Sequence, residues 1–173
     1  MMYSFRTVVL MLLALAINGC KKDNTTPLDF SKLTTTDIHC VTFGAPDSTD
    51  WTFDSYWTAQ ESALLKFNDT LTVTDTLTGW IEVSAPCPNP GNGIFILGVN
   101  SEFSCKMKLV CVNTEMQILY YSSEIFHGGV SWIPLDLTTN TAFRKSEYYR
   151  LYYSFSNAQD SVYYKGHGDI RIE

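Results

Sequence analysis

The chain has 173 residues, a formal net charge of −6 at pH 7, and a composition in which 14% of residues are aromatic and 17% charged. An acidic protein repels phosphate backbones, so composition argues against nucleic-acid binding, which starts from a basic surface. The length suits one domain that buries about two-thirds of its unfolded surface, once a leader and a tether are set aside.

The first residues form a targeting segment. Arg6 precedes an unbroken apolar stretch over residues 8–17, which is shorter than the roughly 20 apolar residues that a membrane-spanning helix needs. A charged start and a short apolar centre are typical of a secretory signal peptide. The Ile-Asn-Gly-Cys that ends this stretch, residues 17–20, resembles the lipobox of bacterial lipoproteins. The alternative is an ordinary signal peptide with a plain cysteine.

The lipobox resemblance implies that residues 1–19 are removed and that Cys20 carries a diacylglyceryl group. Two or more acyl chains, at about 0.8 kcal/mol per buried methylene, make a stable anchor. Residues 20–36 continue as a polar stretch rich in Thr and Asp, which we expect to be a flexible tether with a mean reach of roughly 20 Å. We expect the domain to span residues 37–173 and the protein to sit in the cell envelope, in the outer membrane, with the membrane as its first partner.

Besides Cys20 the chain holds four cysteines, and outside the cytosol an even number indicates disulfides. They are Cys40, Cys87, Cys105 and Cys111. Residues 103–111 alternate in polarity like a half-buried strand, so Cys105 and Cys111 face the core together. They lie roughly 20 Å apart along that strand, too far for a bridge, which needs Cα atoms within about 7 Å. We expect the pairs 87–111 and 40–105, with free buried cysteines as the alternative.

The remaining pattern is mainly β. Thr58 and Glu61 form a capping box that predicts one short helix over residues 58–67. Strands are expected at 70–77, 79–85, 93–99, 105–112, 116–123, 130–137, 148–155 and 168–173, with the third and fourth joined as a hairpin through residues 100–102. Many short strands at this spacing are typical of a sandwich or barrel. We predict an antiparallel immunoglobulin-like β-sandwich.

The order of motifs in residues 83–173 resembles the C-terminal sorting domains of bacterial proteins secreted by the type IX system. The matching motifs are Cys87-Pro88-Asn89-Pro90, Gly93-Ile94-Phe95, Asp136-Leu137, Tyr149-Arg150-Leu151-Tyr152 and Ile170-Arg171-Ile172. The sequence departs from the family where Cys87 replaces a tyrosine and Glu147 replaces a glycine. The resemblance implies the sandwich fold.

Motifs of catalysis are missing from the sequence. It contains no nucleophile elbow, no His-Glu-x-x-His, no phosphate-binding glycine loop and no dinucleotide fingerprint, so we expect neither an enzyme nor a cofactor. Phe-His-Gly-Gly at 126–129 resembles an oxyanion loop, but without a serine elbow we expect a glycine turn. His167 and Asp169 could share a metal or a hydrogen bond, but two ligands make no site, and we expect a turn and no metal.

Pairs of adjacent tyrosines recur in the second half of the chain. In the stretch 148–155, side chains point alternately to the two faces of a strand. We expect Tyr149, Leu151, Tyr153 and Phe155 to face the core, and Tyr148, Arg150 and Tyr152 to form an exposed aromatic ladder. Such a ladder suits sugar rings or a protein partner; the alternative is cross-strand aromatic pairing that only stabilises the sheet.

These expectations describe a lipid-anchored envelope protein whose β-sandwich is a non-catalytic interaction or structural module. An envelope protein or a glycan is the partner we expect beyond the membrane. The alternative is a carbohydrate-binding surface lipoprotein that uses its exposed aromatic residues.

Overall fold

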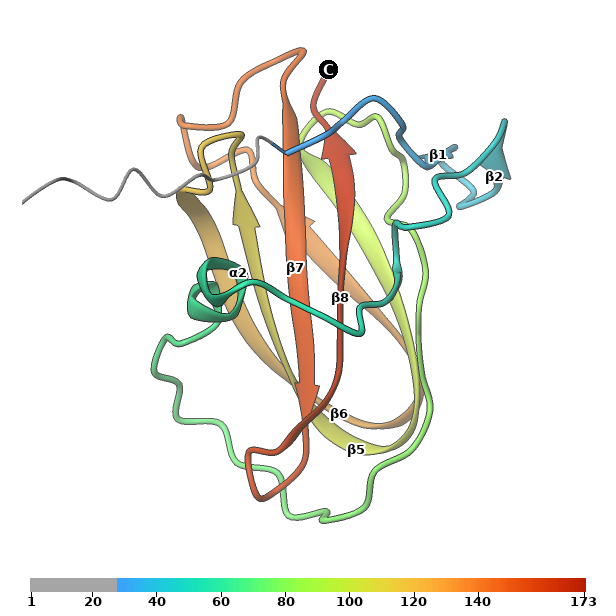
Figure 1. Cartoon of the computed structure of the whole chain (residues 1–173). Coiled ribbons are helices and arrows are strands. Elements are labelled where there is room, and N and C mark those ends of the chain that lie inside the picture. The colour runs from blue at the N-terminus through green and yellow to red at the C-terminus, as the bar shows by residue number, and fades with distance from the viewer. Residues whose placement is uncertain (1–27) are drawn as a thin grey trace, which may run out of the picture.

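The computed structural model describes residues 28–173, so the leader, Cys20 and the first part of the tether lie outside the described residues. A curved antiparallel sheet wraps around one core, and the short helix α2 (Ala59–Leu64), the only helix of the described part, lies across its outer face (Figure 1). No helix within residues 28–173 has the length and apolar character to cross a membrane.

Residues 28–173 contain eight strands, and six of them form one sheet in the order β3-β8-β7-β5-β4, with β6 also paired to β5. Their bounds are β1 Thr35–Thr36, β2 Thr42–Phe43, β3 Thr52–Phe53, β4 Ile81–Val83, β5 Ile94–Val112, β6 Ile118–Asp136, β7 Tyr148–Ser156 and β8 Val162–Arg171. All pairings within the sheet are antiparallel. The sheet nearly closes into a barrel-like sandwich, which confirms the mainly β, antiparallel fold with one short helix; the immunoglobulin-like arrangement is not confirmed.

Strands β5 and β6 are each 19 residues long and pair with one another from end to end. The predicted hairpin through residues 100–102 is therefore wrong. The ladder instead has an irregularity between Ser101 and Ser104, opposite Gly128 and Gly129, which both have positive φ. A bulge of this kind bends a strand without ending it. The first half of β5 can thus pair with β4 and the second half with β7.

Two further local expectations change. The expected strand over residues 70–77 is not regular structure, although its alternating Thr and Leu fit a strand by propensity; no neighbour pairs with it. The glycines at 128 and 129 lie inside β6 at the bulge rather than in a turn between strands. Both outcomes depend on which segments meet across the sheet, and local pattern does not carry that information.

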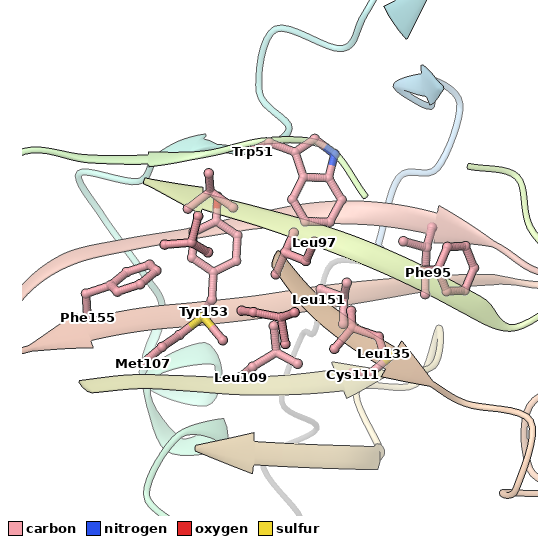
Figure 2. Packing of buried hydrophobic residues seen from close by; sticks show 14 of the residues in the cluster. Trp51, Phe95, Leu97, Met107, Leu109, Cys111, Leu135, Leu151, Tyr153 and Phe155 are labelled. Carbon is pink, nitrogen blue, oxygen red and sulfur yellow. The ribbon is translucent and has the colours of Figure 1, made fainter. Parts of the chain in front are cut away.

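The core confirms the predicted alternation. Cys105, Met107, Leu109 and Cys111 of β5 are fully buried, as are Leu151, Tyr153 and Phe155 of β7, while Tyr149 is nearly so. All of these side chains belong to one cluster. Figure 2 shows Met107, Leu109 and Cys111 with Phe95 and Leu97 from the first half of β5 and Leu135 from β6, and with Trp51 at one side. The bend in β5 lets one strand supply both walls of the core.

The expected disulfide pairs are wrong. Cys40 is bonded to Cys87, with their Cα atoms 5.0 Å apart, and Cys105 and Cys111 are free and buried. The reason is a backbone pairing: the amides of Thr36 and Asn89 each donate to the other residue's carbonyl, at 2.8 and 3.1 Å. This pairing brings Cys40 beside the proline loop, while the two thiols of β5 face the core. The bond closes the loop that contains α2.

Candidate functional site

The expected aromatic ladder on β7 is not exposed. Tyr152 has no exposed surface, because Trp57 packs edge-on against its ring at 5.6 Å and its hydroxyl donates to Glu61 at 3.0 Å. Alternation correctly placed Tyr152 on the outer face, yet residues 57–69, the cover segment, lie over that part of the face. The helix in this segment begins at the predicted capping box, in which the Thr58 and Glu61 side chains each accept from the other's backbone amide.

The other two members of the expected ladder are also occupied. Arg150 donates to both carboxylate oxygens of Asp169, at 2.6 and 2.8 Å, and to the carbonyl of Asp29 at 3.0 Å. Tyr148 is half-buried against Phe30, with ring centroids 5.7 Å apart. Residues 28–30, which the sequence analysis assigns to the tether, therefore contact the start of β7.

His167 and Asp169 lie on the same face, as expected, but they have different partners. The Nδ1 of His167 lies 2.7 Å from the carboxylate of Asp54, and the same carboxylate oxygen accepts from the indole of Trp57 at 2.7 Å. Within the described part of the chain, no group of three or more His, Cys, Asp or Glu side chains could hold a metal ion. His167 therefore helps to position Trp57 through Asp54.

A groove of about 600 Å³ opens beside the covered tyrosine, between the cover segment and the outer face of β5, β7 and β8. We call it the lysine groove, because Lys66, Lys106, Lys108 and Lys165 line it together with Ser154 and Ser156. Its position follows from the register. Lys106 pairs with Ser156, and Lys108 and Lys165 pair with Ser154 from the strands on either side.

Ser154 and Ser156 form the floor of the lysine groove. They follow Arg150 and Tyr152 on the same face of β7, since side chains two residues apart point the same way. Both residues are small, and they are only 5% and 6% exposed. The groove exists because these small side chains lie between longer ones on the neighbouring strands.

Asp69 of the cover segment organises two of the lysines. Its carboxylate lies 3.3 Å from the ammonium of Lys106 and 2.9 Å from that of Lys108. Lys106 also reaches Asp160 at 2.7 Å. Burial alone would lower the pKa of Lys106, but its hydrogen bonds with Asp160 and Asp69 outweigh burial and raise that pKa. Burial would raise the pKa of Asp69, and the hydrogen bonds from the two lysines lower it.

The other two lysines have no acidic partner among the described residues. Lys165 lies over the ring of Trp57, with Nζ 5.2 Å from the ring centre, and Lys66 is exposed at the end of the cover segment. Four lysines and two aspartates line the groove, which leaves a formal charge of +2 in a chain whose net charge is −6. The arrangement can hold an anion and hydrogen-bond a ligand rich in hydroxyl groups.

Part of the lysine groove could have been predicted from the sequence. Lys106 and Lys108 alternate with the core-facing residues of β5, so their position on the outer face could have been inferred. Two features could not be inferred. Lys165, some 60 residues later in the chain, lies in the same row of the sheet as Lys108, and residues 57–69 form a wall of the groove.

A second buried polar position lies outside the groove. Asp50 is 4% exposed; one of its oxygens accepts from Thr34 at 3.4 Å, and the other has no partner among the described residues. Burial, together with the nearby carboxylates of Asp169 and Asp47, raises the pKa of Asp50 to about 7. Asp169 is better provided for, because it is paired with Arg150.

No family model matches the chain, and no curated protein matches it.

Proposed function

We propose that the protein is a lipid-anchored protein of the cell envelope, in the outer membrane, and that its β domain is a non-catalytic interaction module. The observation that carries this proposal is the lysine groove. The partner, an envelope protein or a glycan, binds there rather than on an aromatic ladder.

The energetics of the groove support a binding function. Like charges gathered on one face of a sheet destabilise it, and burying a charge without a partner costs more. The cover segment offsets this cost for Lys106 and Lys108 through Asp69, but the neighbouring Lys165 and Lys66 remain without a carboxylate in the described structure. A concave surface that holds excess positive charge in an acidic protein is suited to an anionic partner.

The position of the groove supports an anchored module. The described chain begins next to the start of β7, where Phe30 meets Tyr148 (Figure 1). Ser154 lies further along the same strand, about 20 Å from Tyr148 at about 3.3 Å per residue. Cys20 precedes Leu28 by eight residues. An anchor at Cys20 would thus attach the chain to the lipid near the start of β7, and the groove lies further along the same strand.

The anchor is tested on the mature protein purified from membranes. Mass spectrometry should find an N-terminus at Cys20 that carries acyl groups, and Cys20→Ser should abolish incorporation of labelled palmitate. Mature protein that begins elsewhere and carries no lipid would refute the anchor.

The groove is tested by site-specific photo-crosslinking in cells. A crosslinker at Asn68, on the rim of the groove, should yield an adduct with an envelope component. A matched crosslinker at Val130 of β6, whose side chain is also exposed, should not yield that adduct. The same adduct from both positions, or none from Asn68, would refute a partner site in the groove.

A carbohydrate-binding lipoprotein is the second candidate, and one observation favours it. The groove combines serine hydroxyls, lysine ammonium groups and an exposed aspartate with the apolar side chain of Val162, which are groups that hydrogen-bond and contact sugars.

A further inference from the structure

The lining of the lysine groove indicates a class of ligand. We infer that the groove binds an acidic saccharide, with a carboxylate or phosphate group held between Lys108 and Lys165 above Ser154, and sugar hydroxyls directed toward Ser156 and Asp160. This inference rests on the proposed function and goes further by naming the ligand of the same site.

The anion position follows from one row of the sheet. Lys108, Ser154 and Lys165 are direct neighbours on β5, β7 and β8, and neighbouring Cβ atoms across a ladder lie about 5 Å apart. The two lysines therefore stand about 10 Å apart with the small Ser154 between them. Their long side chains can both reach an anion above the serine, whose hydroxyl supplies a third donor.

Both ammonium groups have donors to spare. An ammonium group has three N–H donors. Lys108 uses two of them, one to Asp69 at 2.9 Å and one to the carbonyl of Phe67 at 2.7 Å. The ammonium group of Lys165 lies over the face of Trp57, and it has no hydrogen-bond acceptor among the residues described. By contrast, Lys106 reaches Asp69, Asp160 and the carbonyl of Leu71, so we assign it to organising the groove.

The rest of the groove suits a hydroxyl-rich ring. Asp160 has an exposed carboxylate, 77% accessible at its side chain, which can accept from sugar hydroxyls. Ser156 and Asn68 supply donors and acceptors. Val162 is 54% exposed, so it offers apolar contact to the C–H face of a sugar. The volume of about 600 Å³ falls within the range of about 300–1,000 Å³ for small-molecule sites.

Other ligand classes fit less well. An apolar ligand would remove water from the lysines without replacing its hydrogen bonds. A neutral sugar would leave the positive charges of Lys165 and Lys66 uncompensated. Nucleic acid is opposed by the net charge of −6 on the whole chain. An acidic peptide has the right charge but does not use the hydroxyl-rich floor.

The test is isothermal titration calorimetry on the mature acylated protein in detergent micelles. The probes are a galacturonic acid trisaccharide, glucose 6-phosphate, a neutral galactose trisaccharide, inorganic phosphate and a tetraglutamate peptide. We expect binding of at least one acidic sugar at least about tenfold tighter than that of the neutral sugar, since charge-assisted hydrogen bonds contribute that much. The two acidic sugars distinguish a carboxylate from a phosphate as the recognised group.

Matched variants locate the binding. Lys165→Gln should weaken binding of the acidic sugar at least about tenfold. Ser154→Leu should block this binding, because the larger side chain fills the groove above residue 154. Lys145→Gln, at an exposed lysine outside the groove, should leave affinity unchanged. Circular dichroism and urea unfolding of each variant establish that it is folded.

The outcomes separate this inference from the proposed function. Equal affinity for acidic and neutral sugars, no saccharide binding, tighter binding of tetraglutamate or of free phosphate, or an unaffected folded Lys165→Gln variant would each overturn the acidic-saccharide ligand. A specific protein adduct at Asn68 in cells would then still support the interaction module. Absence of any adduct with an envelope component at Asn68 refutes the partner site in the groove.

Discussion

The two halves of the outer face of β7 have the same parity and belong to the same strand, yet they differ in almost every property. In the covered half, Arg150 and Tyr152 are packed under other segments, and their polar atoms have partners. In the other half, which we call the groove half, Ser154 and Ser156 are small buried residues that line the lysine groove. The cover segment contacts both halves, because Trp57 packs on Tyr152 and also lines the groove.

This difference shows where function can lie on a sheet. The covered half holds the large aromatic residue Tyr152, whose packing stabilises the fold. The groove half holds small polar residues between lysines, and Lys66 and Lys165 there have no carboxylate partner among the described residues, so their donors remain available to a ligand. The aromatic residues visible in the sequence thus point to the structural half, whereas two serines mark the candidate site.

The largest effect should come from breaking the covered half. Tyr152→Ala removes a fully buried ring that contacts Trp57 and His167, and large-to-small substitution at such a site costs about 4 kcal/mol. Tyr56→Ala, at a tyrosine 77% exposed, should change stability by less than about 0.5 kcal/mol. Urea unfolding of the mature protein measures both, and equal effects would contradict the covered arrangement.

The disulfide should contribute next. Cys40 and Cys87 are separated by 47 residues that include the cover segment, so the bond restricts the unfolded state of that whole loop. The Cys40→Ser, Cys87→Ser double variant should lose about 3 kcal/mol, and reductant should destabilise the native protein but not the variant. A non-reducing peptide map that links Cys105 or Cys111 to either residue would contradict the pairing.

The buried carboxyl group of Asp50 should make the free energy of unfolding depend on pH. The folded pKa of Asp50 is raised to about 7 from 3.8, so the folded protein keeps its proton where the unfolded chain has lost it. Stability from this group is full below pH 4 and is lost as pH rises toward 7. We therefore compare the free energy of unfolding of Asp50→Asn with that of the native protein. Between pH 4 and pH 8 this difference should shift in favour of the variant by an amount on the order of 3 kcal/mol.

Unfolding free energies measured across this pH range test the Asp50 prediction. The Asn variant should show a weaker decline of stability between pH 4 and 7 than the native protein. An identical decline in both proteins would assign the pH dependence to other groups.

The smallest effect should come from the edge of the cover. Thr58→Ala removes the N-cap of α2 and should cost about 1 kcal/mol. Hydrogen exchange should speed up first in residues 59–64 and at Tyr152, whose hydroxyl partner Glu61 belongs to the same capping box. Unchanged exchange in this helix would show that packing, rather than capping, holds the cover in place.

Several features could be predicted because they depend on neighbours along the chain. The capping box set the start of the helix, and alternation over 105–111 and 149–155 placed the buried side chains correctly. Strand boundaries failed at residues 100–102, because the bulge there depends on the opposing glycines of β6. The disulfide failed because the pairing of Thr36 with Asn89 joins segments that no local pattern connects.

The amino-acid order by itself determined that this protein is a mainly β, antiparallel domain with one capped helix, since periodicity and capping act over a few residues. Only the tertiary structure decided that Tyr152 is buried and that Lys108, Ser154 and Lys165 share a row, because both depend on contacts between segments far apart in the chain. Alternation assigns a residue to a face of a sheet; whether that face meets solvent depends on which distant segment packs against it.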